Sequence, residues 1–190
     1  MARPRQFDEE RAVDAAMRAF IRSGYEATST QDLCEATGLG RSSIYNTFTS
    51  KHELFTKALR YYMDVRTATI IATLESEVPV HERIDTLFRM LLEPKDGLPP
   101  GCLVVNSMIE LAPHDAEVAK LLKRDYDRRF AAIRTALAAA QAAGEISPDK
   151  DPGALAHFVI SSIGGMQVAL RGGATPDTVR SIAQTVLQAL

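Results

Sequence analysis

The stretch at residues 24–59 reads GYEATSTQDLCEATGLGRSSIYNTFTSKHELFTKAL. It contains a short helix with capping residues, a Gly-Leu-Gly turn at residues 38–40, a second short helix with polar faces, and a Ser50-Lys51 start to a third helix. Two short helices joined by a tight glycine turn are typical of the helix-turn-helix motif. The stretch therefore predicts an all-α protein that begins with a three-helix DNA-binding domain.

The segments beside the turn support this prediction. Ahead of the stretch, an apolar face at helical spacing predicts a first helix that starts near the acids of residues 8–10 and stops at Gly24. Arg3 and Arg5 precede it in a short arm, which is either a DNA-backbone contact or a solvated tail. The apolar face consists of Val13, Ala16, Met17, Phe20 and Ile21.

Side-chain caps are expected at the start of the next helix. Thr28 or Ser29 can accept hydrogen bonds from the first free N–H groups, and Gln31 or Asp32 is placed to complete a capping box. Gly38 is expected to end this helix, because glycine tolerates the left-handed conformation found there.

The second short helix, residues 41–48, is expected to present a polar face to DNA. Ile44 and Phe48 share one side and would anchor it, whereas Arg41 and Asn46 suit the edges of guanine and adenine in a major groove. Lys51, in the first turn of the next helix, would share a phosphate with that helix's N–H groups. The residues predicted to contact DNA are Thr28, Ser29, Thr30, Gln31, Arg41, Ser42, Ser43, Tyr45, Asn46, Thr47 and Lys51.

This N-terminal pattern resembles the DNA-binding domain of the TetR family of bacterial transcriptional regulators. Two positions differ from the family pattern: Gly40 stands where the family usually has a Ser or Thr cap, and Thr47 stands where His or Tyr is common. The resemblance implies a DNA-binding domain at residues 1–50 and a helical effector-binding and dimerisation domain at residues 51–190. The matching positions are Gly24-Tyr25, Thr28-Ser29, Ala36 to Leu39, Ile44-Tyr45 and Phe48 to Leu54.

The resemblance also implies a function. We expect a homodimeric repressor that binds a palindromic double-stranded operator and is released by a small, largely apolar or electrophilic effector. In the family, the long helix from residue 51 to about residue 76 links the effector to the DNA. No cofactor is implied.

Composition neither announces nor excludes DNA binding. The net charge is -2, and residues 1–66 hold ten Lys/Arg against nine Asp/Glu. If this part of the chain binds DNA, its positive charge must therefore be concentrated on one face.

No apolar run reaches membrane-spanning length and the N-terminus lacks a signal-peptide pattern, which favours the cytoplasm. Two cysteines and four scattered histidines predict neither a disulfide framework nor a metal site.

Amphipathic helices are expected through the remaining chain, around residues 84–92, 102–112 and 115–143, with a Pro- and Gly-rich loop at residues 94–101. The third of these helices carries a run of charge that is most simply a solvated face. That run contains Lys120, Lys123, Arg124, Asp125, Asp127, Arg128 and Arg129.

The last two helices are predicted to form a dimerisation unit. A stripe of small residues on the first would let two helix axes approach closely, and an apolar seam runs along the second. Paired about a twofold axis they would make a four-helix bundle, although packing within one chain competes for part of the seam. The predicted dimerisation residues are Ser161, Gly165, Ala169, Val179, Ile182, Ala183, Val186 and Leu187.

A mostly apolar effector pocket with a few polar groups is expected among the body helices. Its candidates are Met63, Phe88, Met90, Cys102, Asn106, Met108, Ile109, Tyr126, Phe130, Phe158, Ser162 and Met166.

Cys102 leaves two interpretations open. It starts a predicted helix, where a thiolate is favoured, and the stretch Gly101-Cys102-Leu103 resembles one TetR subgroup with members that sense electrophiles or oxidants through cysteine. It is equally compatible with a small buried apolar residue. An all-helical enzyme using Cys102 is a poorer alternative because no base or oxyanion partner is identifiable by spacing. A carrier of apolar ligands would leave the polarity of residues 41–51 unexplained.

Overall fold

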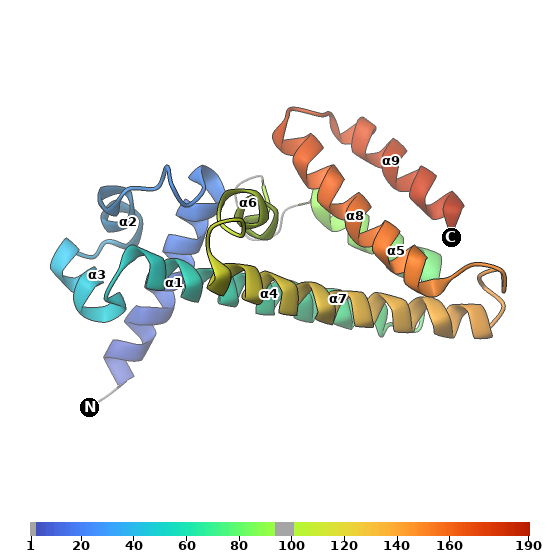
Figure 1. Ribbon diagram of the computed structural model, residues 1–190, viewed down its shortest axis with the longest axis horizontal. Helices are drawn as coiled ribbons and strands as arrows, with labels where there is room; N and C mark the ends of the chain where they lie inside the picture. The colour runs from blue at the N-terminus through green and yellow to red at the C-terminus, as the bar shows by residue number, and fades with distance from the viewer. Residues whose placement is uncertain (1–2, 94–100) are drawn as a thin grey trace. The chain divides into compact units, whose positions relative to one another are not determined.

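The computed structural model describes the backbone of residues 3–93 and 101–190, and the side chains of residues 9–93 and 101–190. Within these ranges the chain is helical and contains no strand, which confirms the all-α prediction. The helices are α1 (Arg3–Ser23), α2 (Thr30–Thr37), α3 (Arg41–Phe48), α4 (Lys51–Leu74), α5 (Val80–Leu92), α6 (Leu103–Glu110), α7 (Ala116–Ala142), α8 (Pro152–Arg171) and α9 (Pro176–Ala189) (Figure 1).

The chain divides into two compact units. Unit 1 comprises the described parts of Met1–Val65 and Leu98–Leu122, and unit 2 those of Arg66–Gly97 and Lys123–Leu190. Helices α4 and α7 each supply their first part to unit 1 and their remainder to unit 2. These compact units do not coincide with the boundary expected at residue 50. The division at residue 50 into a DNA-binding part and an effector-binding part stays a prediction.

In unit 1 the apolar face predicted for the first helix forms the centre of the core. Ala16 and Phe20 are fully buried, and the Phe20 ring meets the Phe55 ring of α4 edge to face at 5.1 Å. Helix α1 begins at Arg3, so the expected N-terminal arm is helical, and the side chains of Arg3 and Arg5 lie outside the described residues. The expected loop at residues 94–101 also lies outside them, except for Gly101.

In unit 2 helices α5, α8 and α9 pack on one another, with α8 and α9 as antiparallel neighbours (Figure 1). Their starts follow from the sequence. The Asp151 carboxylate accepts hydrogen bonds from the first N–H groups of α8, and the Thr175 hydroxyl does the same for α9. Proline occupies the first turn of both helices, where its missing N–H costs nothing.

The charge run on α7 is only partly a solvated face. Lys120, Lys123, Arg124, Asp127 and Arg128 are exposed, as expected. The prediction was wrong for the other two residues, because the Asp125 side chain is 4% exposed and that of Arg129 is 14% exposed. They share the helix face of the buried residues Val118, Leu122, Ile133 and Ala136, so their position in the apolar register was the available signal.

Helix α8 is long and apolar enough to cross a membrane by length and composition alone. Core helices of soluble proteins pass the same test.

Candidate nucleic-acid interface

The entry to α2 is built by a capping box between Ser29 and Asp32. The Ser29 hydroxyl accepts a hydrogen bond from the Asp32 N–H at 3.1 Å, and the Asp32 carboxylate accepts one from the Ser29 N–H at 2.7 Å. The Ser29 hydroxyl also donates to the Asp32 carboxylate at 2.7 Å, and this hydrogen bond, followed by the one from the Ser29 N–H, holds the pKa of Asp32 below its ordinary value. At the other end Gly38 adopts φ 69°, the left-handed conformation that lets the chain turn into α3.

Not every residue predicted beside α2 is available to DNA. Thr28 is 1% exposed and its hydroxyl donates to the Gly24 carbonyl at 2.6 Å, so its side chain supports the loop instead of facing outward. Gln31 is exposed but its amide donates to Glu35 at 2.9 Å. We leave Thr28 out of the proposed contacts and keep Gln31.

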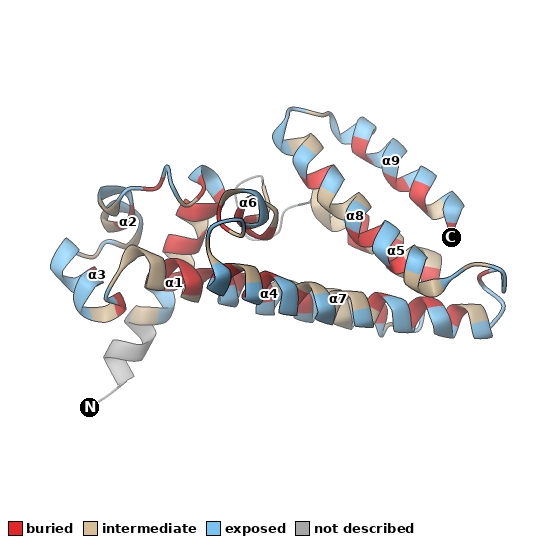
Figure 2. Cartoon of the chain, viewed as in Figure 1, coloured by how far each residue is buried: buried red, intermediate tan, exposed pale blue. Residues whose placement is uncertain are grey.

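Helix α3 is anchored on one side and polar on the others. Ile44 and Phe48 are 1% and 0% exposed, as their spacing predicts. The remaining residues cover the outer side of the helix, which is mostly exposed in Figure 2. Of these, Arg41, Ser42, Ser43, Tyr45 and Asn46 are exposed and Thr47 is half-buried.

Tyr45 ties α3 to α2 across the turn. Its hydroxyl lies 3.1 Å from the hydroxyl of Thr30, and the Arg41 guanidinium lies 5.8 Å from the centre of its ring. The Thr30 hydrogen bond, helped by the positive charge of Arg41, holds the pKa of Tyr45 below its ordinary value. These contacts pre-order three of the predicted DNA-contacting side chains on one surface.

Lys51 is positioned at the start of α4. The Ser50 hydroxyl caps this helix by accepting a hydrogen bond from the Glu53 N–H at 3.0 Å. The Lys51 ammonium lies 4.3 Å from the centre of the Tyr25 ring, a cation–π contact that orients its charge. Ammonium and free helix N–H groups together are suited to hold one phosphate.

The effector candidates of unit 1 differ in exposure. Met63 is buried, and Cys102 and Asn106 are half-buried. The side-chain nitrogen of Asn106 is buried without a hydrogen-bond partner among the described residues, which suits a ligand contact. Met108 and Ile109 are 38% and 70% exposed, so neither is enclosed within this unit.

The effector candidates of unit 2 form two groups. Tyr126 and Phe130 stack with parallel rings 6.4 Å apart, and the His157 ring stacks on Phe130 at 4.4 Å. Phe88 and Met166 lie in the core, Met90 packs against it, Ser162 is half-buried and Phe158 is 43% exposed. Phe158 therefore faces away from the core of its unit.

Some of the predicted dimerisation residues are buried in unit 2 and others are exposed. Val179, Ala183 and Val186 are buried in the unit's own core, so packing within one chain takes this part of the seam. The outer surface retains Ser161, Gly165 and Ile182 as exposed residues, with Ala169 and Leu187 half-buried.

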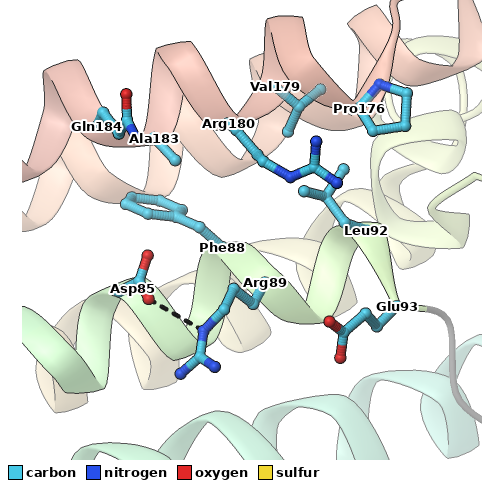
Figure 3. A pocket seen from close by; sticks show the side chains of 10 residues that line it. All are labelled: Asp85, Phe88, Arg89, Leu92, Glu93, Pro176, Val179, Arg180, Ala183 and Gln184. Carbon is cyan, nitrogen blue, oxygen red and sulfur yellow. Dashed lines mark ion pairs between the residues drawn. The ribbon is translucent and has the colours of Figure 1, made fainter.

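A groove of about 300 Å³ lies between α5 and α9 (Figure 3). Phe88, predicted for the effector pocket, lines it beside Val179 and Ala183, predicted for dimerisation. At its edge Asp85 and Arg89 form an ion pair at 3.0 Å. The structure thus joins residues that the sequence assigned to different roles.

Comparison with protein families matches both parts of the chain. Residues 12–58 match the model described as "Bacterial regulatory proteins, tetR family". Residues 81–186 match the model described as "Tetracyclin repressor-like, C-terminal domain".

Individual relatives match over nearly the whole chain. The HTH-type transcriptional repressor ComR of Escherichia coli (strain K12) is 36% identical, over 98% of this chain and 90% of its own. The HTH-type transcriptional repressor DhaR of Mycobacterium sp. (strain GP1) is 28% identical, over 94% and 89%. A solved structure of a cysteine mutant of the TetR family regulator CifR, complexed with 26-base-pair double-strand operator DNA, is 27% identical with a TM-score of 0.85, over 98% and 99%.

Proposed function

This chain belongs to the TetR family of bacterial regulatory proteins, and we propose that it is a transcriptional repressor that binds operator DNA as a homodimer. Like its relatives, it is a transcriptional regulator and not an enzyme. Relatives named as repressors support the direction of regulation. A DNA-binding regulator of bacteria works in the cytoplasm, where we place it.

The outer surface of α3 is the observation that carries this proposal. Arg41 and Asn46 are exposed side chains that pair with guanine and adenine edges, and they stand on a helix held by buried Ile44 and Phe48. Lys51, at the start of α4, supplies a phosphate contact that fixes the register without reading sequence.

Dimerisation is expected because the surface of one α3 helix contacts only a few base pairs. One short recognition helix reads few base pairs, and a twofold pair doubles the site and requires a palindromic operator. Helix α8 supports such pairing, because Phe158 and Val168 are 43% and 51% exposed although both are large and apolar. The exposed small residues Ser161 and Gly165 on the same helix allow a close approach.

Release of DNA is assigned to a small, largely apolar effector bound in the body. Such an effector acts only if it binds the DNA-free conformation better than the DNA-bound one. Within unit 2, the stacked rings of Tyr126 and Phe130 are the aromatic contacts that support this assignment.

A gel-shift experiment with the DNA upstream of its own coding region tests the function. We expect the full-length protein to bind this DNA in preference to a shuffled sequence of the same composition at moderate salt. Arg41→Ala should reduce the preference, whereas Arg180→Ala, an exposed arginine on α9, should keep it in full. Equal binding to both DNAs by the wild type would argue against the proposal.

A second candidate function is electrophile sensing by Cys102, and it has its own observation. The Cys102 thiol is half-buried at the start of α6, and the Tyr62 hydroxyl donates to its sulfur at 3.7 Å. Addition of this thiol to an α,β-unsaturated carbonyl would form a carbon–sulfur bond at a junction with α4, break the carbon–carbon π bond and place the thiol proton on the α-carbon. We expect Cys102→Ser to abolish operator release by an electrophile and Cys34→Ser to leave it intact. Unchanged release in Cys102→Ser would remove this candidate.

A further inference from the structure

Asp125 and Arg129 form a buried ion pair on α7 in unit 2. One Asp125 oxygen, Oδ2, lies 2.8 Å from Arg129 Nη2. The other, Oδ1, accepts a hydrogen bond of 2.6 Å from the hydroxyl of Thr67, which is fully buried on α4. The carboxylate therefore has a partner on each oxygen.

The Arg129 guanidinium, unlike the Asp125 carboxylate, has buried nitrogens that lack hydrogen-bond partners among the described residues. Its Nε and Nη2 atoms are buried and have no hydrogen-bond partner in the part of the chain that the structure describes. The contact from Nη2 to Asp125 has the distance of an ion pair but not the direction of a hydrogen bond, so it balances charge without satisfying the N–H groups. A buried N–H group left without an acceptor is unfavourable, and folded proteins rarely keep one unless something else occupies the site.

Aromatic residues neighbour Arg129 along α7. Phe130 follows Arg129 directly, and Tyr126 lies one helical turn before it, both half-buried. The Tyr126 hydroxyl is engaged, at 2.6 Å from His157 Nδ1, so the Tyr126–Phe130–His157 stack offers mainly ring faces. Buried donors and aromatic rings carried by neighbouring positions of one helix are side chains of the kinds that small-molecule sites combine.

We propose that Arg129 is the polar anchor of the effector site and takes a neutral carbonyl oxygen of a small, mostly apolar molecule. This inference rests on the proposed function, since it assigns a ligand class to the effector-binding body. A carboxylate is disfavoured because Asp125 already balances the Arg129 charge, and a second carboxylate would place an unbalanced negative charge beside it in a buried site.

Pairs of probes that differ only at the acceptor test this proposal. Acetophenone and cyclohexanone carry a carbonyl oxygen, and α-methylstyrene and methylenecyclohexane replace it by a CH2 group of similar size. Benzoate and cyclohexanecarboxylate supply the charged alternative. Each probe is titrated into full-length protein containing 15N-labelled arginine, and the Arg129 Nε–H resonance is assigned by its loss in Arg129→Lys.

We expect at least one ketone to shift this resonance and to bind roughly tenfold or more tightly than its alkene counterpart, as for a hydrogen bond to a charged donor. The double variant Asp125→Asn/Arg129→Gln, which leaves no unpaired charge, should lose that preference. Arg134→Gln, an exposed arginine on the same helix, should keep it.

Three results would overturn the proposal: an unshifted resonance with both ketones, as an ordered water alone would give; carboxylates that bind more tightly than ketones; and a ketone preference that survives in the double variant. Binding to operator DNA is measured on the same preparations. Retained DNA binding with any of these results rejects the Arg129 anchor alone, whereas no DNA binding by the wild type rejects the repressor function itself.

Discussion

The carboxylate of Glu110, the last residue of α6, accepts a hydrogen bond of 2.9 Å from the backbone N–H of Tyr25, in the loop between α1 and α2. Its second oxygen accepts one of 2.7 Å from the N–H of Glu26. One side chain thus holds the loop that leads into the helix-turn-helix, and both partners lie in unit 1. Hydrogen bonds to a charged acceptor contribute about 1.5–3 kcal/mol.

Replacing Glu110 should release this loop. In Glu110→Ala both amides lose their acceptor, so we expect the Tyr25 and Glu26 amides to exchange with solvent at least roughly tenfold faster, since about 1.4 kcal/mol corresponds to tenfold. Hydrogen exchange resolved by residue measures this. Glu117→Ala, a more exposed carboxylate paired with Arg60, is the control and should leave both amides unchanged. Unaltered exchange in Glu110→Ala would show that the loop does not depend on this contact.

Gly24 tests the same contact from the other side. It adopts φ 84°, and a Cβ added there would lie 2.9 Å from Glu110 Oε2. Gly144 adopts φ 80° with no neighbour near such a Cβ among the described residues. Both alanine variants carry the backbone strain of a positive φ, about 1 kcal/mol, but only Gly24→Ala also displaces Glu110. We expect Gly24→Ala to lower the free energy of unfolding by about 1–3 kcal/mol more than Gly144→Ala.

The Gly24 result has an internal check. In a Glu110→Ala background the displaced carboxylate is absent, so the two glycine variants should become equally destabilising. An excess that persists there would assign the cost of Gly24→Ala to something other than Glu110.

Asp115 is expected to make the folding stability of unit 1 depend on pH in the acidic range. Its carboxylate accepts the Val118 and Glu117 N–H groups at the start of α7 and contacts the His52 ring at 2.6 Å. The Val118 hydrogen bond first, and then His52, hold the pKa of Asp115 below its ordinary value. A depressed pKa stabilises the fold above the unfolded-state pKa, and this stability is lost as pH falls through the folded-state value.

We therefore expect Asp115→Asn to be less stable than wild type near pH 7 by about 1 kcal/mol, and the difference to shrink as pH falls from about 5 to about 3. Chemical denaturation at several pH values measures it. Asp127→Asn, on an exposed pair with Lys123, should show a smaller difference throughout. A difference for Asp115→Asn that stays constant across this range would contradict the prediction.

The exposed apolar side of α8 predicts the oligomeric state. Val168 is 51% exposed within one chain, so Val168→Glu should leave the fold intact and place a charge in the proposed dimer interface. We expect sedimentation to report a dimer for wild type and a shift to monomer for this variant. Val78→Glu, at a residue 40% exposed outside the helices, is the matched control and should remain dimeric. A Val168→Glu protein that sediments as wild type would place the interface elsewhere.

Local rules of the sequence were sufficient for the helices. Ser29, Gly38 and Ser50 mark helix ends through their own hydrogen bonding and backbone preference, and the structure places all three ends there. The buried side of α3 likewise follows from the spacing of Ile44 and Phe48. These features depend only on residues a few positions apart.

Contacts between distant residues were not available from such rules. Thr28 was predicted to face DNA, but its burial depends on how the loop folds back on Gly24. Asp125 and Arg129 were predicted to be solvated because charge dominates that run, although both fall on the apolar side of the helix; Thr67, the partner of Asp125, lies on another helix and no local pattern predicts that contact. Glu110 is a polar residue on an otherwise apolar helix, but its partners are backbone amides of a distant loop, which no side-chain pattern predicts.

We propose that α3 reads bases while Lys51 holds the DNA backbone. The measurement is the affinity of wild type, Arg41→Ala, Asn46→Ala and Lys51→Ala for upstream DNA and for shuffled DNA across a range of salt. We predict that Arg41→Ala and Asn46→Ala lose roughly 1–3 kcal/mol on upstream DNA and little on shuffled DNA. Lys51→Ala should weaken both and lower the salt slope by about 1. Equal losses on both DNAs for all three variants would contradict the claim that this helix reads sequence.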